Sequence, residues 1–190
     1  MRFDPWTSVD GFEIKNAFEI SPKFLEDKRG FFSRLADVDI ISENLDYEFA
    51  ISQINNSFSV IKNTFRGFHI QLGEYAETKV VRCIRGTCID FILDLRVSSP
   101  TFLKYGKLEL TPEKRNLACL PKGCAHGILT TSPNTEVIYF VDNSYNPHSE
   151  FGLSVSDSIF NGFFDNYEIL ASSKDSSWPD FNLEKFKKLL

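Results

Sequence analysis

Short runs of β-forming residues, separated by turn residues at close intervals, fill the chain from about residue 50 to residue 160. The run 80–84 is followed by Arg85-Gly86-Thr87, and the run 88–96 leads to Ser98-Ser99-Pro100. Nineteen phenylalanines in a chain of 190 residues add side chains that favour strands. The pattern predicts an all-β fold, an antiparallel sandwich or barrel. The remaining predicted strands are 50–59, 66–72, 105–110, 116–120, 127–131 and 137–142.

The run 88–96 alternates most clearly. Asp90 and Asp94 fall on one face of the predicted strand. The opposite face is apolar and carries Ile89, Phe91, Leu93 and Leu95. This alternation predicts a strand with one buried and one exposed face.

Helical periodicity is confined to two stretches, 38–45 and 182–190. No linker rich in glycine, serine or proline divides the chain, and no repeat of fixed period is present. The sequence therefore predicts a single domain over residues 1–190, with short peripheral helices and a C-terminal helix near 182–190.

The charge balance argues against nucleic-acid or membrane partners. Lysine and arginine total 21 against 26 acidic residues, a formal net charge of −5. The most apolar stretch, 89–95, contains two aspartates and is far shorter than the about 20 residues of a membrane-spanning helix. Residues 1–6 lack the apolar run of a secretion signal. We expect a cytoplasmic protein that binds neither nucleic acid nor membranes.

The four cysteines form two C-x4-C pairs, Cys83 with Cys88 and Cys119 with Cys124. Positions five apart on one strand point to opposite faces, so neither pair converges on a metal unless a turn separates its members. Disulfides or a zinc site are the less favoured interpretation. We expect four small buried side chains and no metal.

Histidine-dependent chemistry has three candidates, His69, His126 and His148. Strand alternation places His69 and Gln71 on one face. The same alternation assigns Arg66, Phe68 and Ile70 to the other face.

Lys79 begins a strand on which it shares a face with Val81 and Cys83. An ammonium group among apolar neighbours indicates either a face that lines a cavity or an edge lysine with its charge in water.

Several kinds of chemistry lack their motif. The chain has no G-x-S-x-G, no P-loop and no G-x-G-x-x-G. Gln71 stands where a small β-barrel metal site would have its second histidine. Of the kinds of chemistry considered, acid–base catalysis without a cofactor or metal is the one that remains.

The sequence resembles the dTDP-4-dehydrorhamnose 3,5-epimerase family over most of its length. The segment 27–32, Asp-Lys-Arg-Gly-Phe-Phe, is similar to the family's D-x-R-G-F-F, and 121–127 is similar to its P-x-G-F-A-H-G. Several such motifs in the right order make chance similarity improbable. The other matching segments are 53–57, 66–71, 90–96, 99–102, 145–147 and 172–175, with Lys79 and Tyr139 at the family's spacing.

The resemblance implies a double-stranded β-helix of the cupin (jelly-roll) type, without a metal, assembled as a homodimer whose strands cross between subunits. It implies inversion of C3, C5 or both in a nucleotide-linked 4-keto-6-deoxy hexose, in the synthesis of deoxysugars for cell-wall or surface polysaccharides. His69 resembles the general base, Asp175 the carboxylate that orients it, Lys79 the enolate-stabilising residue and Tyr139 the acid. The residues that resemble substrate contacts are Arg29, Gln53, Asn55, Arg66, His126 and Tyr145.

The chain departs from the family pattern around its pocket aromatics. Ser144 replaces the first of two adjacent tyrosines before Pro147, and Asp157 lacks the flanking tryptophan and proline of the family's W-x-D-P. A dTDP-, CDP- or GDP-linked sugar therefore stays open as substrate. A sugar 3,4-ketoisomerase and a carbohydrate-binding cupin without turnover are the alternative functions.

Overall fold

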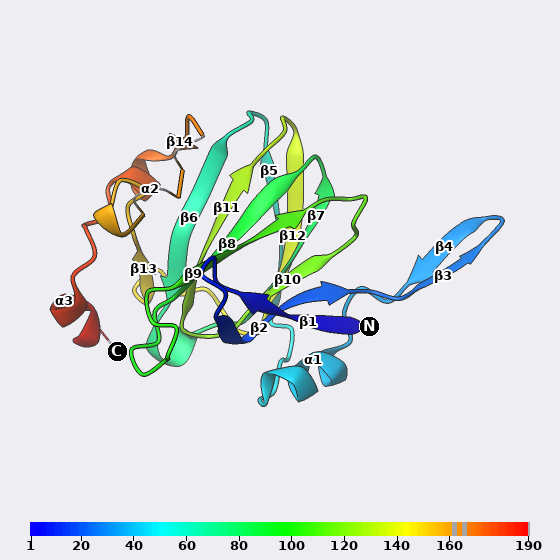
Figure 1. Ribbon diagram of the computed structural model, residues 1–190, viewed down its shortest axis with the longest axis horizontal. Coiled ribbons are helices and arrows are strands. Elements are labelled where there is room, and N and C mark those ends of the chain that lie inside the picture. Colours follow the sequence, from blue (N-terminus) through cyan, green and yellow to red (C-terminus); the bar gives the residue numbers. More distant parts are fainter. Residues whose placement is uncertain (161–162, 165–166, 190) are drawn as a thin grey trace.

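The computed structural model describes residues 1–160, 163–164 and 167–189, and most of its strands form two facing sheets (Figure 1). The first sheet has the order β1-β2-β10-β7-β12-β5. The second has the order β13-β6-β11-β8-β9, with β14 parallel to β6. The strands of the first sheet are β1 (Arg2–Thr7), β2 (Glu13–Ser21), β10 (Leu117–Leu120), β7 (Lys79–Arg85), β12 (Thr135–Val141) and β5 (Gln53–Ser59). Those of the second are β13 (Glu150–Gly152), β6 (Thr64–Gln71), β11 (Cys124–Thr130), β8 (Cys88–Asp94), β9 (Tyr105–Leu110) and β14 (Leu170–Ala171).

The chain passes from one sheet to the other at each step from β5 to β8, and again from β9 to β12. This alternation between facing sheets, with antiparallel neighbours, is a double-stranded β-helix of the cupin, or jelly-roll, type. The all-β prediction is confirmed. One part of the space between the sheets is filled by apolar side chains, including Trp6, Val81 and Ile92. The rest of that space holds the cavity described below.

The strands predicted between residues 50 and 142 are present with boundaries shifted by a few residues. The prediction of a half-exposed strand at 88–96 is wrong, because β8 is buried on both faces. Its outer face, which includes Phe91 and Leu93, is covered by aromatic residues from the C-terminal part of the chain. Among these are Phe160, Phe163, Phe164 and Phe186.

Strand alternation also fails once in β6. His69 pairs with His126, and Arg66 pairs with Ile128. The two residues on β6 are three positions apart and their partners on β11 are two positions apart, so β6 contains one extra residue. Arg66 therefore lines the same cavity between the sheets as His69. Phe68 instead packs with Phe91 and Phe160 in the apolar cluster that covers the outer face of the second sheet. The prediction that Arg66 faces away from His69 is wrong, because the bulge at Gly67 reverses the alternation.

Both predicted helical stretches are helical. The first is α1 (Val38–Leu45), where the Asp37 side chain caps the N-terminus and Ile41 and Leu45 pack against the first sheet. The second is α3 (Leu183–Lys187), anchored by buried Phe186; residue 190 lies outside the described residues. A further short helix, α2 (Ser173–Ser176), contacts β6.

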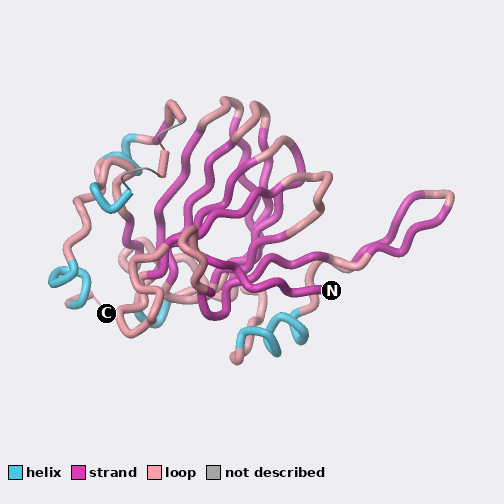
Figure 2. The backbone as a smooth tube through the Cα atoms, viewed as in Figure 1, coloured by secondary structure: helices cyan, strands magenta, loops and turns pink. Residues whose placement is uncertain are grey.

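Strands β3 (Phe24–Asp27) and β4 (Gly30–Ser33) form a separate hairpin that projects from the two sheets (Figures 1 and 2). Its side chains Leu25, Phe31 and Phe32 are exposed, Phe32 by 66%. A hairpin of this kind has little stability alone.

All four cysteines are free and buried, as expected. In the part of the chain that the structure describes, no helix has the length and apolar character needed to span a bilayer.

Candidate active site

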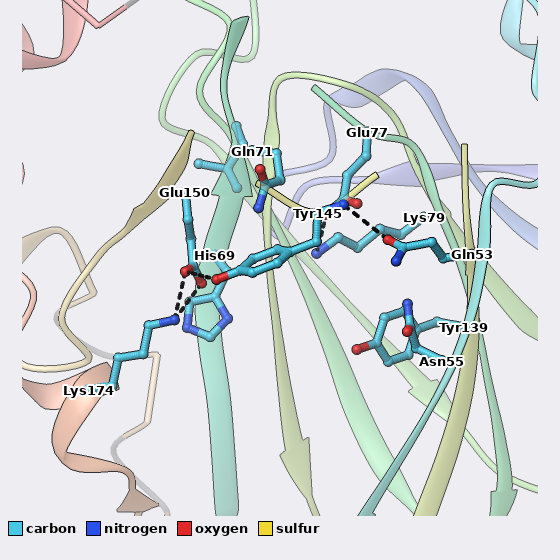
Figure 3. A pocket seen from close by; sticks show the side chains of 11 residues that line it. Gln53, Asn55, His69, Gln71, Glu77, Lys79, Tyr139, Tyr145, Glu150 and Lys174 are labelled. Carbon is cyan, nitrogen blue, oxygen red and sulfur yellow. Dashed lines mark hydrogen bonds and ion pairs between the residues drawn. The ribbon is translucent and has the colours of Figure 1, made fainter. Parts of the chain in front are cut away.

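A polar cavity lies between the two sheets and consists of two adjoining hollows of about 430 and 290 Å3. Both hollows are lined by His69, Lys79, Tyr139 and Lys174, so they form one continuous site. Figure 3 shows the larger hollow, whose other lining residues are Gln53, Asn55, Ile70, Gln71, Glu77, Tyr145 and Glu150. The smaller hollow adds Ser57, Arg66, His126, Ile128, Ser172 and Asp175.

His69 and Asp175 form a pair across 106 residues of sequence, with His69 Nε2 at 2.6 Å from Asp175 Oδ1. Ser172 supports the carboxylate, because its hydroxyl donates to Asp175 Oδ2 at 2.8 Å. Burial alone would raise the pKa of Asp175, but the hydrogen bonds from His69 and Ser172 bring it below its ordinary value. The ionised carboxylate accepts from Nε2, so a neutral His69 keeps its lone pair on Nδ1.

Tyr139 comes from β12 in the first sheet, whereas His69 comes from β6 in the second. The phenol and the imidazole therefore approach the cavity from opposite walls (Figure 3). Burial, and secondly the negative charge of Glu77, raises the pKa of Tyr139, with Arg66 opposing. The phenol is thus held protonated near neutral pH and can donate a proton.

Lys79 is a cation inside the cavity, with only 15% of its side chain exposed. Its ammonium lies 3.1 Å from the Glu77 carboxylate, whose side chain is 9% exposed. Lys79 and Tyr139 lie on neighbouring strands, because Val141 pairs with Lys79 and Tyr139 pairs with Val81. Lys79 therefore lines the same hollow as His69 and Tyr139.

His126 pairs with Asp90 of β8 at 3.0 Å. Asp90 is fully buried, and burial raises its pKa against the opposing positive charges of His126 and Lys79. This second histidine–carboxylate pair extends the site into the smaller hollow.

One edge of the larger hollow carries an ion-paired cluster. Glu150 accepts hydrogen bonds from the Tyr145 hydroxyl at 2.8 Å and from the Lys174 ammonium at 2.7 and 2.8 Å (Figure 3). The Tyr145 backbone N–H donates to Gln53 Oε1 at 3.1 Å, which ties this loop to β5.

The structure brings together nine of the ten residues named from the sequence. The exception is Arg29, which lies on the β3–β4 hairpin and is ion-paired with Asp27 at 2.6 Å. It lines a separate hollow of about 410 Å3. His148, the third histidine, is exposed and lines neither hollow of the site.

Four ionisable residues at or behind the site are not among the residues predicted from the sequence: Glu77, Glu150 and Lys174, which line it, and Asp90, which pairs with His126. Two signals were available, because Lys174 adjoins Asp175 and Asp90 lies on the polar face of its strand. Glu77 precedes its strand and Glu150 begins a strand of three residues, so no periodicity marks them. Within residues 1–160, 163–164 and 167–189, no group of three or more His, Cys, Asp or Glu side chains is placed to hold a metal ion.

Comparison with known proteins gives consistent matches. The family model for dTDP-4-dehydrorhamnose 3,5-epimerase matches residues 11–182. The dTDP-4-dehydrorhamnose 3,5-epimerase of Shigella flexneri is 34% identical over 169 residues, covering 89% of this chain and 93% of that protein. The crystal structure of the same enzyme from Elizabethkingia anophelis NUHP1 matches with a TM-score of 0.86 at 31% identity, covering 95% and 96% of the two chains. A 3,5-epimerase from Legionella pneumophila Philadelphia 1, solved with dTDP-4-keto-L-rhamnose, matches with a TM-score of 0.83 at 27% identity, covering 100% and 97%.

Proposed function

This chain belongs to the dTDP-4-dehydrorhamnose 3,5-epimerase family, and we propose that it inverts C3, C5 or both in a dTDP-linked 4-keto-6-deoxy hexose. It is an isomerase of the epimerase class. The observation that carries the finer proposal is that His69 and Tyr139 approach one cavity from opposite sheets. Inversion needs this arrangement, because a proton must leave one face of the sugar and return to the other.

His69 is the base in this proposal. The C4 carbonyl acidifies the hydrogens on the flanking carbons, so a neutral imidazole can remove one of them. Asp175 holds the ring in one tautomer and stabilises the imidazolium that forms.

Lys79 and Tyr139 complete the reaction. Proton removal places negative charge on the C4 oxygen, and an ammonium at that oxygen stabilises the enolate. Tyr139 then delivers a proton to the opposite face. Each of these groups contributes about 10²- to 10⁴-fold in rate.

The nucleotide diphosphate occupies the remaining polar groups. Arg66 and Lys174 are cations at the hollows and suit the diphosphate oxygens. Tyr145, a residue exposed by 52%, suits a nucleobase face. The dTDP sugar bound to the Legionella pneumophila relative supports thymine as the base.

A homodimer of a single-domain chain, residues 1–190, accounts for the projecting hairpin. The hairpin exposes Leu25, Phe31 and Phe32, and β5 at the sheet edge exposes Ile54 and Phe58. Apolar surfaces of this kind are characteristic of protein interfaces. Packing the hairpin against a second copy would bury them and could bring Arg29 to that copy's cavity.

Product analysis tests the proposed function. Incubation with a dTDP-linked 4-keto-6-deoxy hexose should give a product whose NMR spectra show an inverted C3 or C5 and an unmoved C4 carbonyl. A carbonyl at C3 would identify a ketoisomerase instead. Tight binding of the substrate without any product would support the non-catalytic alternative and overturn the proposal.

A further inference from the structure

Glu77 is a charged residue of the larger hollow that has no part in the proposed reaction. Its carboxylate is almost buried and lies 3.1 Å from the Lys79 ammonium. A buried carboxylate is costly unless a partner compensates for the lost hydration, and a buried ion pair adds little to stability over apolar residues of the same size. The position of Glu77 therefore points to a role at the site.

The backbone on either side of Glu77 is held by hydrogen bonds to neighbouring segments of the chain. The Thr78 N–H donates to Asp142 Oδ1 at 2.7 Å, and the Thr78 hydroxyl is bonded to the Tyr47 hydroxyl at 2.9 Å. The Asn143 side chain donates to the carbonyl oxygens of Glu74 and Ala76 at 2.8 and 3.3 Å. These bonds fix the segment carrying Glu77 to the end of β12, the strand of Tyr139.

Lys79 by itself has no comparable constraint on its side chain. The lysine side chain is a flexible four-carbon chain, so its ammonium group can occupy many positions in the cavity. An acceptor carried on an anchored backbone segment favours one position of the ammonium and leaves its other N–H donors free. Since Lys79 and Tyr139 lie on adjacent strands, that position is beside the phenol and across the cavity from His69.

We propose that Glu77 is a positioning residue that holds the Lys79 ammonium where the C4 oxyanion develops. The proposal rests on the proposed function. What matters is an acceptor oxygen at this place, since the oxyanion must find the ammonium already oriented. An amide oxygen can serve as that acceptor, whereas the thioether of a methionine of similar size is only a weak acceptor.

Two substitutions separate this role from a merely structural one. Glu77→Met should lower kcat by about 10- to 100-fold, because an ammonium displaced by about 1 Å is poorly placed for the transition state, while KM stays within about threefold. Glu77→Gln should restore kcat to within about threefold of the wild type. Glu74→Met is the matched control, since Glu74 is an exposed acidic residue on the same segment, and it should leave both constants unchanged.

A double-mutant cycle tests whether Glu77 acts through Lys79. In a Lys79→Met background, Glu77→Met should cause no further loss of kcat, because the group that it positions is gone. A full additional loss in that background, or wild-type kcat for Glu77→Met alone, overturns the proposal. Wild-type protein without epimerase activity would instead refute the proposed function, so the two failures are distinguishable.

Discussion

At the scale of single residues, the strongest constraint on the site is the 2.6 Å contact between His69 and Asp175. Asp175 lies in a helix of four residues whose cap, Ser172, also donates to its carboxylate. A helix this short has little stability of its own, so the hydrogen bonds of Asp175 hold both the helix and the imidazole. The carboxylate that we propose to orient the base therefore also stabilises this part of the chain.

Replacing Asp175 by asparagine should make stability less dependent on pH. The lowered pKa of Asp175 means that the ionised carboxylate stabilises the folded state above its ordinary value of 3.8, and this contribution is lost as pH falls through the lowered value. At about pH 7 we expect the variant to be less stable by about 1–3 kcal/mol. Urea unfolding at neutral and acidic pH measures the difference, which should shrink in acid.

Asp180→Asn supplies the control for that experiment, because Asp180 is exposed in the same part of the chain. It should unfold like the wild type at every pH. A stability difference for Asp175→Asn that stays constant into acid would show that the carboxylate's charge is not the cause.

At the scale of elements, the bulge in β6 decides which side chains reach the site. Gly67 has a φ of +133°, and a Cβ there would lie 2.6 Å from Gly127 Cα and from the His126 carbonyl oxygen. Only a residue without a side chain fits so close to β11. The bulge therefore depends on glycine, and with it the placement of Arg66 beside His69.

Gly67→Ala should destabilise the protein by about 2–4 kcal/mol, from backbone strain and a backbone clash together. Thermal unfolding measures this loss. Gly73→Ala is the matched control, since Gly73 also has a positive φ, +62°, but nothing lies within 4 Å of the place that an alanine methyl group would take there. If the two variants lose equal stability, close contact with β11 is not what requires glycine at residue 67.

The individual strands show how much of the structure could be predicted from the sequence. Strands such as β7 and β9 were found because turns bound them and their residues favour strands. Strands β1 and β3 were not predicted, since most of their residues are at least partly exposed and leave no alternation. The resemblance to the family identifies His69 and Tyr139. The prediction placed Arg66 on the wrong face of β6, because strict two-residue alternation does not reveal the extra residue of a bulge.

At the scale of the whole molecule, the β3–β4 hairpin has no partner sheet among the described residues. Its isolation and its exposed aromatic residues favour assembly with a second copy.

Phe32→Asp should convert the proposed homodimer to a monomer, because it places a charge in the apolar contact proposed for the hairpin. Light scattering after size-exclusion chromatography gives the mass directly. Leu103→Asp, an exposed apolar residue outside the hairpin, should leave the dimer intact. Wild-type protein with the mass of one chain, or a Phe32→Asp variant that remains dimeric, would rule out this assembly.

We propose that removal and return of the proton occur on opposite walls of one cavity. Reaction of the Tyr139→Phe variant in D2O tests it most directly, with the sugar's C3 and C5 followed by NMR. We expect deuterium at these carbons with their configuration retained, because His69 still exchanges the proton from its own side. The His69→Asn variant should give no exchange. Inverted product at the wild-type rate from Tyr139→Phe, or continued exchange in His69→Asn, would contradict it.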